Sequence, residues 1–156
     1  MMGGMTEQEW VVAVTQIQQL KARRIRALDG KDWDAYESLH WPDHVSNNDN
    51  EPRLPIKDQV NRLRGLLHKG VVTVHHAHTP DIQFKSPNEA SGVWAMEDML
   101  YWTQDGQDAW LHGFGFYHET YAKRDGQWKF TSRALKRIKV MTSPGAETTK
   151  ADPPAA

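Results

Sequence analysis

The 156-residue sequence contains no cysteine. A disulfide framework, a thiol nucleophile and thiolate metal sites are therefore excluded. It also has little excess charge of either sign, with 19 Lys and Arg against 20 Asp and Glu. Because nucleic acids and anionic membranes bind strongly basic surfaces, we expect neither as a partner, and a small, nearly neutral molecule is expected instead.

Long apolar runs are lacking as well. No segment approaches the roughly 18 apolar residues of a membrane span, and residues 1–10 lack the basic and apolar stretches of a secretory signal. We therefore expect a cytoplasmic protein. The length suits one domain, which the patterns below place at residues 6–141.

Helical patterns fill the first part of the chain. A capping box at residues 6–9 precedes apolar residues at helical spacing and predicts a helix over residues 6–28. Asp32 predicts the cap of a short second helix, and residues 54–67 repeat the helical spacing. The polar segment 41–53 predicts a loop, which could act as a lid or as a recognition surface.

From residue 71 the apolar period changes to two. This change predicts strands at 71–78, 82–85, 91–102, 110–123 and 127–140, and two Asp-Gly pairs predict hairpins that join the last three into an antiparallel meander. The predicted fold class is α+β, with helices covering one face of a long, curved sheet. Residues 143–156, rich in Pro and Ala, are expected to be disordered.

The predicted strand 110–123 has two different faces. One face carries Leu111, Gly113, Gly115, Tyr117, Glu119 and Tyr121, and the other carries Trp110, His112, Phe114, Phe116 and His118. Glycines within a strand leave room for a ligand or merely permit curvature. The aromatic face, with Trp128 or Phe130 in line, predicts a subunit interface and hence a homodimer or homotrimer, unless helices cover it.

Three histidines lie between residues 74 and 78. His76 and His78 share one face of the predicted strand, but a metal site needs further convergent ligands, and none is predicted. His75 points toward the open face, where an imidazole can accept a proton if a carboxylate orients it. Asp29, at the end of the first helix, is the candidate carboxylate, and a solvated turn residue is its alternative role.

Asp98 interrupts an otherwise apolar face formed by Trp94, Met96, Leu100 and Trp102. If that face lines a pocket, Asp98 is a desolvated carboxyl group that retains its proton more readily and can act as a proton donor. If the face points outward, Asp98 should pair with a basic residue of a neighbouring subunit.

The segments 27–33, 94–98 and 117–130, together with His75, resemble the SnoaL-like branch of the nuclear transport factor 2-like superfamily over about residues 8–141. The resemblance implies a cone, in which a curved antiparallel sheet wraps around the long first helix and encloses a pocket. Similarity to dehydrochlorinase members implies a dyad of His75 and Asp29. It also implies three further roles: a charge-stabilising Arg133, a helix cation at Arg24 and a pocket aromatic at Tyr117.

The members with this pattern catalyse eliminations without a cofactor. We therefore predict a metal-free lyase that removes water or formaldehyde from a small aromatic or alicyclic alcohol, such as a lignin-derived diaryl diol. His75 would act as the base, Asp98 or Tyr117 as the acid, and Arg133 with Arg24 would stabilise negative charge. The predicted lining comprises Trp33, Trp41, Met96, Gly113 and Gly115. A non-enzymatic binding module and a ketosteroid-type isomerase are the alternatives.

Overall fold

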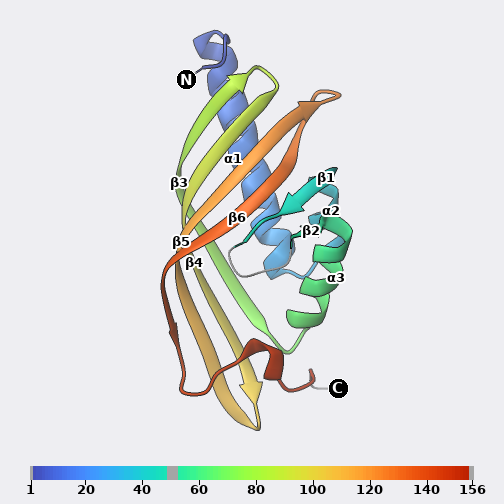
Figure 1. Cartoon of the computed structure of the whole chain (residues 1–156), viewed down its shortest axis with the longest axis vertical. Coiled ribbons are helices and arrows are strands. Elements are labelled where there is room, and N and C mark those ends of the chain that lie inside the picture. The colour runs from blue at the N-terminus through green and yellow to red at the C-terminus, as the bar shows by residue number, and fades with distance from the viewer. Residues whose placement is uncertain (1, 49–52, 155–156) are drawn as a thin grey trace.

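The computed structural model describes residues 2–48 and 53–154. The helices are α1 (Glu7–Asp29), α2 (Trp33–Ser38), α3 (Ile56–Leu66) and the short η1 (Thr148–Lys150). The strands are β1 (His40–Ser46), β2 (Leu54–Pro55), β3 (Val72–Ser86), β4 (Glu89–Gln104), β5 (Gln107–Arg124) and β6 (Gln127–Thr142). They form one curved, open sheet in the order β2-β1-β6-β5-β4-β3. In Figure 1, α1 crosses one face of the long strands, while α2 and α3 lie beside their middle and lower parts.

The helix boundaries follow the capping signals. The main-chain N–H of Glu9 donates to the Thr6 hydroxyl, and the Thr6 main-chain N–H donates to the Glu9 carboxylate, so the predicted capping box is confirmed. The Asp32 carboxylate accepts from the Ala35 main-chain N–H at 3.1 Å and caps α2. No helix of the described residues is long and apolar enough to cross a bilayer.

The sheet confirms the predicted α+β class. Strands β3 to β6 form an antiparallel meander, while β1 departs from it by running parallel to β6. Asp105 and Asp125 have φ values of 51° and 50°, and each is followed by a glycine that also has positive φ. These conformations are those of two-residue hairpin turns, so both Asp-Gly predictions are confirmed.

One loop prediction and one strand prediction need correction. Residues 40–46 form β1 and not a loop, because their main chain pairs with β6; the part of the predicted lid at 49–52 lies outside the described residues. The strands predicted at 71–78 and 82–85 are one strand, β3. Pro80 is tolerated inside it because β3 is an edge strand and its register shifts between His78 and Pro80.

The C-terminal segment 143–154 also differs from the prediction of a disordered tail. The Asp152 carboxylate accepts hydrogen bonds from the main-chain N–H groups of Asp105 and Gly106 at 3.1 and 3.0 Å. Ala146 and Ala151 pack against a cluster of buried apolar residues from the helices and the sheet. The segment therefore caps the hairpin between β4 and β5.

The sheet and helices enclose two apolar clusters. The upper core includes Ile17, Leu20, Phe84, Trp94, Met96, Tyr121, Trp128 and Phe130. The lower core includes Leu28, Tyr36, Val60, Val71, Leu100 and Trp102. On β4, Met96 belongs to the upper core and Leu100 to the lower core. The intervening Asp98 therefore marks the junction of the two cores.

The opposite face of the sheet carries exposed aromatic side chains. Phe114 and Phe116 are 37% and 38% exposed, as the alternation along β5 predicts. Trp128 and Phe130 do not join them, because both are buried in the upper core. The homodimer or homotrimer expected through this face stays a prediction.

Candidate active site

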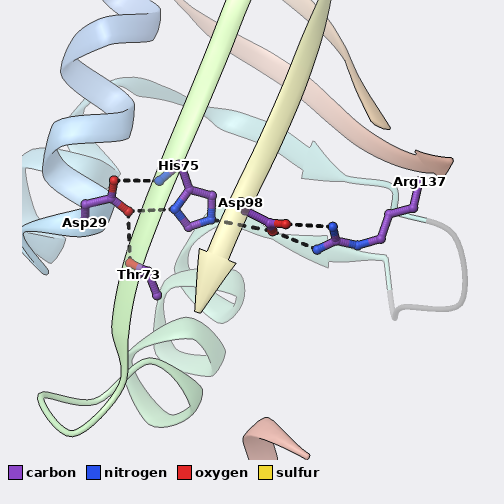
Figure 2. Close-up of polar contacts among 5 residues, drawn as sticks. All are labelled: Asp29, Thr73, His75, Asp98 and Arg137. Atoms are coloured by element: carbon purple, nitrogen blue, oxygen red, sulfur yellow. Dashed lines mark hydrogen bonds and ion pairs between the residues drawn. The ribbon is translucent and has the colours of Figure 1, made fainter. Parts of the chain in front are cut away.

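The structure brings together the end of α1 and the inward face of β3. Asp29 is the last residue of α1, and its Oδ1 lies 2.6 Å from Nδ1 of His75 (Figure 2). The other carboxylate oxygen accepts from the His75 main-chain N–H at 2.9 Å, and the Thr73 hydroxyl donates to Oδ1 at 2.9 Å. The His75 side chain is only 8% exposed. The pairing of His75 with Asp29 that the sequence predicts is therefore present in the structure.

These hydrogen bonds determine the charge on Asp29 and the tautomer of His75. Burial raises the pKa of Asp29, but the hydrogen bonds from the His75 ring and main chain outweigh it, so the pKa lies below its ordinary value. An ionised carboxylate can only accept, so Nδ1 carries the proton in the pair. In the neutral ring, Nε2 then has a free lone pair.

Asp98 lies on the other side of the imidazole. It is paired with His75 across β3 and β4, and its Oδ2 is 3.9 Å from His75 Nε2. Its side chain is only 4% exposed, so the inward orientation is the correct one of the two that the sequence allowed. Arg137 donates to both carboxylate oxygens at 2.8 Å. Such a bidentate contact is a strong form of arginine–carboxylate pairing, and the role of proton donor expected of Asp98 stays a prediction.

Sequence analysis missed two residues of this cluster, Thr73 and Arg137. Arg137 comes from a more distant strand. Its guanidinium reaches from β6 across β5 to Asp98 on β4, and it passes over Gly113, which is paired with Asp98. A Cβ atom at Gly113 would lie 1.9 Å from Arg137 Nη1 and 2.3 Å from Asp98 Oδ1. At Gly115 a Cβ atom would lie 2.2 Å from the Lys136 main-chain oxygen, where β5 and β6 form a bulge. The prediction that both glycines leave room for a substrate is therefore wrong.

The predicted cations Arg24 and Arg133 are both buried. Arg24 donates to Nε2 of His40 at 3.2 Å and to the hydroxyl of Tyr36. The Arg133 guanidinium lies 4.8 Å from the centre of the Tyr117 ring, and its Nε has no partner among the described residues. Burial raises the pKa of Tyr117, so its phenol keeps its proton at neutral pH.

The three predicted lining residues other than the glycines occupy different environments. Met96 is buried in the upper core on the same face of β4 as Asp98. Trp33 packs edge-on against Tyr36, with ring centres 6.0 Å apart, beside the lower core. Trp41 instead lines an external cleft, and its indole N–H donates to the Ala122 carbonyl at 2.8 Å. It is not grouped with His75, because residues 40–46 form a strand.

A groove beside the dyad gives access to His75. It lies between α1 and β3, has a volume of about 440 Å³ and is lined by Lys21, Ala22, Ile25, His75, Ala77 and Trp94, among others. Its apolar part is formed by Ala22, Ile25, Ala77 and Trp94, and its polar part by Gln18, Lys21 and the three histidines of β3. An aromatic or aliphatic group in this groove would contact the face of the molecule on which the imidazole lies.

The other two histidines of β3 also line this groove. His76 Nδ1 and His78 Nε2 lie 2.9 and 3.5 Å from the same oxygen of Glu97, and both side chains are about half exposed. Among residues 2–48 and 53–154, no group of three or more His, Asp or Glu side chains is arranged to hold a metal ion. These histidines therefore share a carboxylate on the surface.

Comparisons with known proteins agree with this architecture. The structure is similar to that of a candidate scytalone dehydratase from Novosphingobium aromaticivorans DSM 12444, with a TM-score of 0.77 and 23% identity over 95% of this chain and 97% of that chain. It is also similar to a type 2 hexachlorocyclohexane dehydrochlorinase, with a TM-score of 0.76 and 18% identity over 97% and 100% of the two chains. A type 3 dehydrochlorinase from Novosphingobium barchaimii LL02 gives a TM-score of 0.74 and 18% identity over 96% and 100%.

At these identities the similarities show the fold, which is the nuclear transport factor 2-like fold expected from the sequence. The sequence profile of the SnoaL-like domain matches residues 11–134, which include the dyad and Asp98. This match covers most of the chain. The chain thus belongs to the SnoaL-like domain family.

Proposed function

We propose that this protein is a cofactor-free lyase that eliminates water or formaldehyde from a small aromatic or alicyclic alcohol. One observation carries the proposal: His75 is held through Nδ1 by an ionised Asp29, and its Nε2 is left without a hydrogen-bond partner among the described residues. An imidazole fixed in this way can act as a general base near neutral pH.

In the proposed reaction, Nε2 of His75 takes a proton from the substrate, and Asp29 stabilises the imidazolium that forms. For loss of water, the proton leaves carbon, a C=C bond forms, and the departing hydroxide takes a proton from an acid. For loss of formaldehyde, the proton leaves a hydroxymethyl oxygen, a C=O bond forms, and the C–C bond electrons pass to the carbon skeleton.

The skeleton can accept those electrons by releasing a second hydroxyl group as water. Tyr117 is our candidate for the acid: burial raises the pKa of its phenol, which keeps the proton in the resting site, and the nearby Arg133 cation favours its release. Arg133 is our candidate for stabilising negative charge, since its guanidinium lies against the Tyr117 ring with one nitrogen unpartnered. Arg24 would contribute through its charge, because its described hydrogen bonds are already directed to His40 and Tyr36.

Two further observations support an enzyme over the alternatives. Hydrogen-bond distance within the dyad is what catalysis needs, and a module that merely binds an apolar ligand has no need of it. A ketosteroid-type isomerase needs a free carboxylate base, whereas Asp98 is held by Arg137 and Asp29 by His75 and Thr73. The structural neighbours named as a dehydratase and dehydrochlorinases support the elimination class, although a fold alone does not decide a function.

The test is to incubate the protein with a panel of aromatic and alicyclic alcohols, diaryl diols and halides, and to detect loss of water, formaldehyde or hydrogen halide by mass spectrometry. His75→Ala should lower turnover by about 10²- to 10⁴-fold while the protein stays folded. The matched control is His118→Ala, which removes a histidine from the outer face of β5, away from the groove. Equal turnover by the His75→Ala variant would eliminate the proposed mechanism.

A further inference from the structure

Arg137 has no part in the proposed reaction, yet its side chain extends from β6 across β5 to hold the carboxylate of Asp98 on β4. The guanidinium is about one-third exposed, whereas the carboxylate that it holds is almost completely buried. Figure 2 shows it approaching Asp98 from the side opposite His75. Only glycine at position 113 permits this crossing, because a Cβ atom there would overlap both Arg137 and Asp98. The arrangement therefore fixes the position of one buried carboxylate.

The fixed carboxylate faces the free nitrogen of the dyad. His75 Nε2 and Asp98 Oδ2 are 3.9 Å apart, which is too far for a hydrogen bond between them. Both atoms are acceptors when His75 is neutral and Asp98 is ionised. A substrate group that satisfies either of them must donate a hydrogen. Ether oxygens, halogens and carboxylates cannot donate one, and a hydroxyl group can.

We propose that Asp98, positioned by Arg137, binds a hydroxyl group of the substrate and thereby makes the site specific for alcohols. This inference rests on the proposed function for the chemistry that follows binding. The hydroxyl donates to Asp98 Oδ2, and the adjoining group of the substrate then presents its proton to Nε2 of His75. Asp98 contacts the substrate directly, while Arg137 acts through Asp98 and is a positioning residue.

The burial of Asp98 determines how much selectivity to expect. A hydrogen bond to a charged acceptor stabilises a complex by about 1.5–3 kcal/mol, which corresponds to roughly 10- to 150-fold in affinity. Bulk water competes poorly at a carboxylate that is 4% exposed. An alcohol should therefore bind at least about 10-fold more tightly than the ether of the same skeleton.

The experiment measures binding and not turnover. Protein with ¹⁵N-labelled histidine is titrated with 1-phenylethanol and, separately, with its methyl ether, and the two dissociation constants are obtained from the chemical shifts of the His75 ring. Wild type should prefer the alcohol by at least 10-fold. Asp98→Asn and Arg137→Gln should each bring the preference close to unity. Lys139→Gln, which removes an exposed charge from the same strand, should leave it unchanged.

A double variant covers the case in which an unpaired buried charge prevents folding. Asp98→Asn/Arg137→Gln removes both charges together, so it leaves neither group as an unpaired charge and should also abolish the preference. The proposal is overturned if wild type binds the ether as tightly as the alcohol, or if the preference persists in Asp98→Asn. A preference that depends on Asp98, without turnover of any compound in the panel, would instead disprove the lyase function and leave the hydroxyl site intact.

Discussion

Two clusters of charged side chains connect α1 to the sheet, and they differ in whether every polar atom has a partner. The first, here called the sealed cluster, consists of Lys21, Glu119, Tyr121 and Trp94. Lys21 forms an ion pair with Glu119, and their side chains are 1% and 0% exposed. The Tyr121 hydroxyl donates to Glu119 at 2.7 Å and accepts from the indole N–H of Trp94 at 2.8 Å.

The second cluster, here called the dyad cluster, consists of Asp29, Thr73, His75, Asp98 and Arg137. It also pairs cations with carboxylates, but His75 Nε2 has no hydrogen-bond partner among the described residues and the guanidinium is partly exposed. A groove reaches the same imidazole, and Lys21 and Trp94 of the sealed cluster line it as well. A closed network leaves no atom for a substrate, so the unsatisfied nitrogen is what distinguishes a candidate active site from a structural ion pair.

The two clusters also differ in what happens to the pKa of a charged group in each of them. Burial lowers the pKa of Lys21 to about 7, so its charge is maintained mainly by Glu119. In the dyad cluster, hydrogen bonds to Asp29 outweigh its partial burial and favour the charged form. Removing one partner should therefore harm folding in the sealed cluster and activity in the dyad cluster.

The largest effect on stability is expected for Lys21→Met. This change leaves the Glu119 carboxylate completely buried without its cation, and it should destabilise the fold by about 3–5 kcal/mol in urea unfolding. The double variant Lys21→Met/Glu119→Gln removes both charges and should recover much of that loss. If the single variant were as stable as wild type, the sealed cluster would not act as a structural ion pair.

Asp29→Asn should have the complementary outcome. The amide cannot hold the Nδ1 proton as a carboxylate does, so turnover on any substrate of the panel should fall by about 10²-fold with a small change in stability. Steady-state kinetics and urea unfolding measure the two effects on the same sample. A large loss of stability with unchanged kcat in the molecules that remain folded would place Asp29 among the structural residues.

The contrast between these clusters could be predicted from the sequence only in part. Asp29 and His75 were accessible, because helical periodicity ends the first helix near Asp29 and strand alternation turns His75 inward. Arg137 was not. The register of β5 and β6 shifts between Thr120 and Tyr121, so Phe130 before the shift and Arg133 and Arg137 after it face the same side of the sheet. A two-residue alternation pattern does not reveal a bulge.

Non-local pairing explains the other errors. Trp41 lies in a strand that exists only because β1 pairs with β6, about 90 residues further along the chain. The position of Asp152 depends on a hairpin more than 40 residues away, which provides the N–H groups that it accepts. Local composition predicts a loop and a disordered tail in these two places, because the partners are distant in sequence.

Gly113→Ala tests whether the crossing of Arg137 matters for the dyad cluster. The new Cβ atom would lie 1.9 Å from the guanidinium, and we expect a loss of about 1–3 kcal/mol in stability as the ion pair with Asp98 is broken. The matched control is Gly65→Ala in α3, where no atom lies within 4 Å of the added Cβ and helix propensity predicts a gain of about 0.5–1 kcal/mol. Equal unfolding free energies for these two variants would contradict the proposed crossing.

The smallest expected effect is a change in how the free energy of unfolding depends on acid pH. It reports on the hydrogen bonds that the Asp29 carboxylate accepts. Because its pKa in the folded protein lies below the ordinary value of 3.8, ionised Asp29 stabilises the fold above that value, and the contribution is lost as pH falls through the lower, folded pKa. The difference in unfolding free energy between wild type and Asp29→Asn should therefore be constant near neutrality and shrink below about pH 4. Thr73→Val removes one of the hydrogen bonds that lower this pKa, so its loss of stability in acid should be smaller than that of wild type and should be complete at a higher pH. Urea titrations between pH 3 and 6 measure both, and identical acid profiles for the three proteins would show that Asp29 is not held in its ionised form by these contacts.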